Sequence, residues 1–123
     1  MGNEIISREL LSDVLEVDVY TIIDDKKTIE NNLSSDLNGD YIAYRENSEH
    51  GLSSWIYLNI HELAHKCKEW AKNKGYIIGV DLDKVNIWSI KEREVINYYE
   101  VYWEDYLEFE FKACQWILES KKD

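Results

Sequence analysis

Residues 59–80, NIHELAHKCKEWAKNKGYIIGV, predict a helix that ends at a glycine and is followed by a strand. Asn59 is a favourable N-cap, and Glu62 stands at the third helical position, where a capping box places its acidic residue. Gly75 follows the last turn, in the position that favours a left-handed backbone. The helix therefore spans about 60–74, and its apolar face consists of Ile60, Leu63, Ala64, Cys67, Trp70 and Ala71.

The segments after this stretch predict an antiparallel meander and a second helix. Strand-forming segments at 76–80, 85–90 and 95–103 are separated by short polar connections, which suit tight turns. The chain from about 105 to 120 then has a helical pattern of apolar residues, formed by Leu107, Phe111, Cys114 and Leu118.

The segments before it predict a smaller helix and strands. Ser7 is suited to cap a short helix, and 17–23 and 41–44 are β-branched or aromatic and predict strands. The sequence therefore indicates an α+β fold, in which an antiparallel sheet of about three to five strands packs with two main helices and a short N-terminal helix.

The composition supports one packed domain. The chain is 45% hydrophobic and 13% aromatic, and it has no apolar run of the ~20 residues that a membrane span needs. We expect a single domain over 1–123, with a helix–strand unit at 1–54 and a helix–meander–helix core at 55–120. Cys67 and Cys114 lie within apolar helical patterns and are predicted to be buried free thiols of a cytoplasmic protein without a secretory signal.

The charge of the chain restricts its partners. The formal net charge of −11 opposes direct binding of nucleic acid, because such binding needs lysine and arginine to replace the counterions of phosphates. It likewise opposes docking on an anionic membrane. Two interpretations stay open: the charge serves solubility alone, or it forms a surface for a basic protein partner.

The pentapeptide HELAH at 61–65 has the H-E-x-x-H spacing of zinc hydrolases. In that hypothesis His61 and His65 bind zinc, Glu62 is the general base, and Glu92 or Glu94 supplies a third ligand. Against it, Glu62 already suits a capping box. Lys68 and Lys72 also lie on the flank of the histidines, where their charge opposes a divalent cation. The favoured interpretation is a structural helix, so no catalytic residue, metal or cofactor is assigned.

Acidic side chains are interleaved with aromatic ones between residues 92 and 110. Seven acids occur there with Arg93 as the one basic residue, and this pattern favours either a solvated surface or a binding site for a basic protein. The predicted partner-binding residues are Glu100, Tyr102, Glu104, Asp105 and Glu108.

The segments NIHELAHKCKEWAKNKGY and FKACQWILE resemble small hypothetical proteins of phages and prophages, and the phage α-β-α (ABA) sandwich domain. The resemblance covers about 55–120, whereas the first fifty residues match only in ISRELLSDVL. It implies a phage or mobile-element origin and a setting in the host cytosol, and it brings no catalytic residues.

We therefore predict a non-enzymatic accessory protein that acts by binding. In its most specific form it is an inhibitor, of the anti-CRISPR kind, that presents carboxylates in place of nucleic-acid phosphates to a host defence protein. The alternatives are the zinc hydrolase and a ligand-sequestering or structural homodimer that uses an exposed sheet face and its tyrosines.

Overall fold

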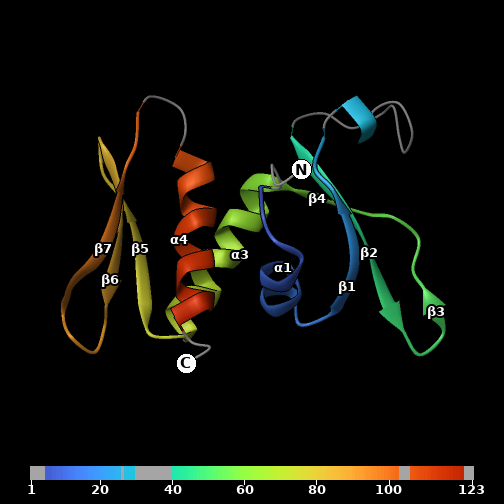
Figure 1. Cartoon of the computed structure of the whole chain (residues 1–123), viewed down its shortest axis with the longest axis horizontal. Helices are drawn as coiled ribbons and strands as arrows, with labels where there is room; N and C mark the ends of the chain where they lie inside the picture. The colour runs from blue at the N-terminus through green and yellow to red at the C-terminus, as the bar shows by residue number, and fades with distance from the viewer. Residues whose placement is uncertain (1–4, 26, 30–39, 103–105, 121–123) are drawn as a thin grey trace. The chain divides into compact units, whose positions relative to one another are not determined.

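The computed structural model describes residues 5–25, 27–29, 40–102 and 106–120. Its contacts group the chain into two compact units, Met1–Leu63 and Ala64–Asp123 (Figure 1). The division falls within the first turn of α3 (Ile60–Asn73).

The first unit begins with α1 (Arg8–Leu15), whose start is set by Ser7. The Ser7 Oγ accepts a hydrogen bond from the Leu10 N–H at 3.0 Å, as predicted for an N-cap. Leu10 is fully buried, and so is Leu11. The helix packs on β1 (Asp18–Ile23), which follows after a left-handed residue, Glu16.

The sheet of the first unit is built around β2 (Tyr41–Ser48). This strand pairs antiparallel with β1 on one side, and with β3 (Gly51–Leu52) and β4 (Ile56–Asn59) along its other edge. A register shift in β1 lies between Val19 and Thr21. The predicted strand 41–44 is thus the first half of a longer one, and the sequence did not indicate β4.

Helix α3 starts directly where β4 ends. The Asn59 Oδ1 accepts hydrogen bonds from the His61 N–H at 2.9 Å and the Glu62 N–H at 3.3 Å, which confirms the predicted N-cap. At the other end, Gly75 has a φ of +101° and donates its N–H to the Lys72 carbonyl at 3.0 Å. Asparagine and glycine therefore set the ends of this helix.

The second unit holds the predicted meander. Strands β5 (Tyr76–Val80), β6 (Lys84–Ser89) and β7 (Glu94–Glu100) form an antiparallel sheet in that order. Helix α4 (Tyr106–Ser120) packs against all three strands, as Figure 1 shows. The core of this unit contains apolar residues of the sheet and of both helices, among them Ala64, Cys67, Ile78, Val85, Ile87, Phe111, Cys114 and Ile117.

The predicted α+β class is confirmed, with two main helices and a short N-terminal one. The described strands form two separate sheets, of four and three strands. The last strand of the meander ends at Glu100 and not at 103, and the contacts divide the chain after Leu63 and not after residue 54. That the chain is a single domain stays a prediction. In the part of the chain that the structure describes, no helix has the length and apolar character needed to cross a membrane.

Candidate functional site

The three-stranded sheet of the second unit has one buried and one exposed face. Side chains alternate between the two faces of a strand, and in β6 the buried ones are Val85, Ile87 and Ser89. These point to the side on which α4 packs. The intervening β6 residues, Lys84, Asn86 and Trp88, therefore lie on the opposite side.

The exposed face carries a row of apolar side chains that crosses all three strands. Ile77 of β5 pairs with Trp88 of β6, which pairs with Val95 of β7. In the next row on the same face, Tyr98 of β7 pairs with Asn86. Ile77, Val95 and Tyr98 are 42%, 47% and 52% exposed, while Trp88 is half-buried. We call Ile77, Trp88, Val95 and Tyr98 the outer face.

One end of the outer face is acidic. Beyond Tyr98, the sheet places Glu100 opposite Lys84, and the Asp81 carboxylate accepts a hydrogen bond from the Asn86 side chain at 2.7 Å. Asp83 lies in the turn beside them, because its carbonyl accepts the Val101 N–H at 2.9 Å. We call Asp81, Asp83 and Glu100 the acidic end; all three are exposed, and Lys84 is the basic residue among them.

Aromatic rings accompany these charges. The Tyr102 hydroxyl donates to Glu100 Oε2 at 3.3 Å, and Tyr102 is 68% exposed. The Lys84 Nζ lies 5.4 Å from the centre of the Tyr98 ring, within the range of a cation–π contact. At the acidic end, the Glu100 carboxylate is thus held by Tyr102, and the neighbouring Tyr98 ring of the outer face contacts the Lys84 ammonium group.

The predicted partner-binding residues are only partly brought together. Glu100 and Tyr102 are in contact, as described. Glu108 is exposed on α4, and its carboxylate lies 3.7 Å from the Lys112 ammonium, which offsets its charge. Glu104 and Asp105 lie outside the described residues. Their assignment to a binding site stays a prediction.

The HELAH histidines lie on the exposed side of α3. His61 is exposed, and the His65 Nε2 lies 3.0 Å from Glu69 Oε1, one turn further along the helix. Among the residues that the structure describes, no three His, Cys, Asp or Glu side chains are grouped so that they could hold a metal ion. Within the described residues, the two histidines therefore have no third side chain beside them that could complete a zinc site.

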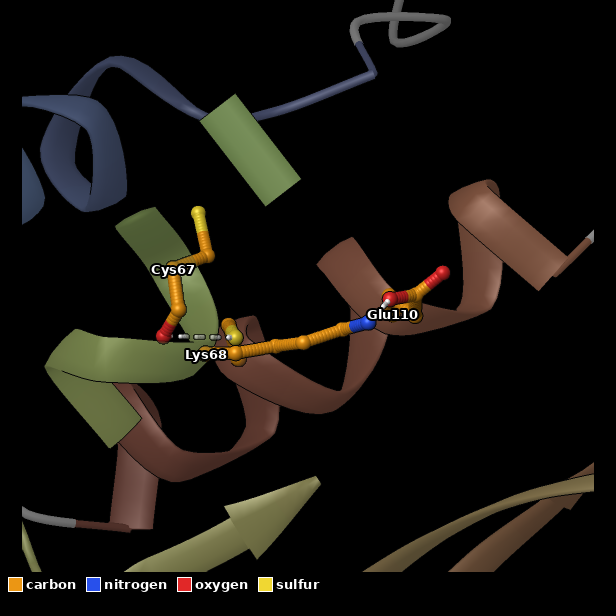
Figure 2. Close-up of polar contacts among 4 residues, drawn as sticks. Cys67, Lys68 and Glu110 are labelled. Carbon is orange, nitrogen blue, oxygen red and sulfur yellow. Dashed lines mark hydrogen bonds and ion pairs between the residues drawn. The ribbon is translucent and has the colours of Figure 1, made fainter. Parts of the chain in front are cut away.

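Two polar contacts join α3 to α4 inside the second unit (Figure 2). The Lys68 Nζ forms an ion pair with Glu110 Oε1, an oxygen that is buried and lacks a hydrogen bond of normal geometry. The Cys114 thiol donates to the Cys67 carbonyl at 3.6 Å. Lys68 is thus directed to α4, whereas the sequence pattern had placed its charge beside the histidines.

The two cysteines are free and buried, as predicted. The side-chain hydrogen bond with Cys114 raises the pKa of the Cys67 thiol, and burial raises it further. Because the thiolate and not the thiol is the nucleophile, this environment disfavours the reactive form of Cys67. The pair is therefore part of the packing between α3 and α4.

No family model, curated protein or solved structure matches the chain.

Sequence reasoning predicted an exposed sheet face with tyrosines, but it missed the apolar row on that face. The consecutive residues Tyr76, Ile77 and Ile78 are all apolar or aromatic, so their pattern does not indicate which side faces the core. The alternation of Lys84, Asn86 and Trp88 with buried residues in β6 was the signal that identifies the outer side.

Proposed function

We propose that this protein acts by binding a basic protein partner at the acidic end, without catalysis. The observation that carries the proposal is the contact between Glu100 and Tyr102. Both side chains are exposed at the end of β7, and the hydroxyl orients the carboxylate. An arginine or lysine of a partner would pair with the Glu100 carboxylate and lie against the Tyr102 ring. This combination is typical of strong interface contacts.

The charge of the whole chain supports the same partner class. A net charge of −11 attracts basic proteins over a distance of about one Debye length and repels nucleic acid. In the finer form of the proposal, the partner is a nucleic-acid-binding defence protein of a host cell, and carboxylates occupy the positions of phosphates. The resemblance to phage and prophage proteins supports this form, and it implies a setting in the host cytosol.

A capture experiment with a matched control tests the proposal. The immobilised chain is incubated with bacterial lysate at 50 mM and 500 mM salt, and the retained proteins are identified by mass spectrometry. We expect basic nucleic-acid-binding proteins that are released at the higher salt, because ion pairs at a surface are screened. Retention that does not respond to salt would contradict the proposal.

A pair of charge reversals then locates the surface. Glu100→Lys and Glu49→Lys both change the net charge from −11 to −9, and both positions are exposed, but Glu49 lies in the turn after β2. For a partner found in the capture, Glu100→Lys should weaken affinity about tenfold and Glu49→Lys much less. Equal losses would mean that the charge of the whole chain, and not this site, determines binding.

A further inference from the structure

The outer face has the width of one helix. Neighbouring strands lie about 4.8 Å apart, so three strands span about 10 Å, which is close to the diameter of an α-helix with its side chains. On the buried face of the sheet, α4 occupies that width, because it packs on β5, β6 and β7. Sheets are stabilised when both apolar faces are covered, and the outer face is apolar in its central row, where Ile77, Trp88 and Val95 pair.

The row brings apolar side chains of three neighbouring strands together on one exposed face. Val95 is 47% exposed and Ile77 is 42% exposed, and Trp88 lies between them in the register. Adjoining large apolar side chains on a soluble surface typically mark an interface. Two aromatic residues, Trp88 and Tyr98, belong to the residue types that dominate interface energies.

The charges around the row are distributed unevenly along the strands. At one end, Asp81, Asp83 and Glu100 surround Lys84. At the other end, the turn between β6 and β7 has the sequence Lys91-Glu92-Arg93 and is followed by Glu94, so its charges balance. A partner that covers the row therefore meets an excess of negative charge at one end alone.

From these observations we infer that the outer face is a docking surface for an amphipathic basic helix of the partner. The apolar stripe of that helix covers Ile77, Trp88 and Val95, and its lysine or arginine residues contact the acidic end. This inference rests on the proposed function and deepens it: the partner must present apolar side chains beside its positive charge. A polycation without apolar side chains would form ion pairs with the acidic end and leave the outer face uncovered.

Two synthetic peptides test the inference with the full chain. One is an 18-residue helix with leucines at helical spacing and lysines elsewhere, and the other has the same composition in scrambled order. Their charges are equal, so a purely electrostatic site binds them equally. We expect the amphipathic peptide to bind about tenfold more tightly by calorimetry, because burial of apolar surface adds to the charge interaction.

Two variants with the same added charge locate the site. Val95→Glu and Leu52→Glu each change the net charge from −11 to −12, and Leu52 is exposed in β3 of the first unit. If the outer face is a docking surface, Val95→Glu should lower the affinity for the amphipathic peptide about tenfold. Leu52→Glu should leave that affinity unchanged or raise it slightly. Val95→Thr, which keeps the β-branched shape, should give a smaller loss and serves if the glutamate variant does not fold.

The outcomes separate the two proposals. Equal binding of both peptides, or equal effects of Val95→Glu and Leu52→Glu, overturns the docking surface and leaves the acidic binding site standing. Failure of both peptides to bind overturns both. Sedimentation analysis of the chain alone supplies a third arm: a dimer that Val95→Glu dissociates would place a second copy on the outer face and overturn the inference.

Discussion

The ammonium group of Lys68 on α3 pairs with the carboxylate of Glu110 on α4, whose side chain is only 10% exposed (Figure 2). A carboxylate at this depth loses most of its hydration, and the lysine supplies the compensating charge. The Lys68 side chain is 39% exposed, so its own ammonium keeps part of its water. The pair is therefore a charged contact between α3 and α4 at the edge of their packed side chains.

Lys68→Met should lower the free energy of unfolding by about 1 to 2 kcal/mol, because it leaves the Glu110 carboxylate buried without its cation. Methionine keeps the unbranched stem that packs between the helices. The measurement is urea unfolding, with Lys66→Met on the exposed side of α3 as control. Adding Glu110→Gln to Lys68→Met should recover part of the loss. Equal stability of the Lys68 and Lys66 variants would show that the pair contributes nothing.

Asn59→Ala should destabilise the protein by about 1 kcal/mol, because the His61 and Glu62 N–H groups lose the side-chain oxygen that accepts them. Asn59→Asp keeps such an oxygen and should retain most of the stability. Thermal unfolding measures both. Asn73→Ala, an exposed change at the end of the same helix, is the control, and it is expected to have little effect. If the cap contributed nothing to stability, Asn59→Ala and Asn73→Ala would be equally stable in thermal unfolding.

The sequence predicted α3 well because its signals are local. Asn59 and Gly75 lie at the two ends, and the apolar spacing between them fits only a helix. It did not predict β4, because the four residues Ile56–Asn59 form a strand only through their pairing with Tyr41–Tyr44. Such pairing depends on chain segments that are distant in sequence. The local pattern of apolar residues does not indicate which segments pair.

The candidate site was predictable in its charge but not in its contacts. The acidic and aromatic composition around Glu100 and Tyr102 is visible in the sequence, and their hydrogen bond needs only neighbours two residues apart. The partner of Lys68 was not predictable, since a helical wheel gives the side of α3 on which it lies but not the helix that packs there. The two faces of the sheet could be distinguished in β6, where residues 84–87 alternate between polar and apolar, but not in β5, where Tyr76, Ile77 and Ile78 follow one another.

Gly75→Ala should cost about 1 kcal/mol, because a φ of +101° is strained for any residue with a Cβ. A steric clash is not the cause, since a Cβ built at Gly75 meets no atom within 4 Å. Gly79→Ala is the matched control: it too has open space, but its backbone lies in β5 without a positive φ. We expect this change to be neutral or stabilising in thermal unfolding. A loss at Gly79 as large as at Gly75 would contradict the role assigned to backbone conformation.

The purified protein should contain much less than one zinc per chain by metal analysis, because the described residues offer His61 and His65 no third ligand. His61→Ala should then change stability by no more than about 0.5 kcal/mol, as expected for an exposed position. His65→Ala should lose only its surface contact with Glu69. Stoichiometric zinc that is lost in both variants would restore the hydrolase hypothesis.

Alkaline pH should destabilise the fold through Cys67. In the unfolded chain a thiol loses its proton above a pH of about 8.5. In the folded chain, the hydrogen bond with Cys114 and burial raise the pKa of Cys67, so the proton is retained. The stabilising contribution is therefore complete below pH 8.5 and is lost as the pH rises, by at most about 1.4 kcal/mol per pH unit.

Urea unfolding between pH 7.5 and 9.5 measures this slope, and Cys67→Ala is the comparison. The alanine variant is less stable at every pH because it leaves a cavity, but it lacks the titrating group, so its stability should decline less steeply. Burial also raises the pKa of Tyr44 and Tyr99, but both titrate at higher pH than the measured window and are present in both proteins. Parallel declines in the two proteins would mean that the Cys67 thiolate is as stable in the fold as in water.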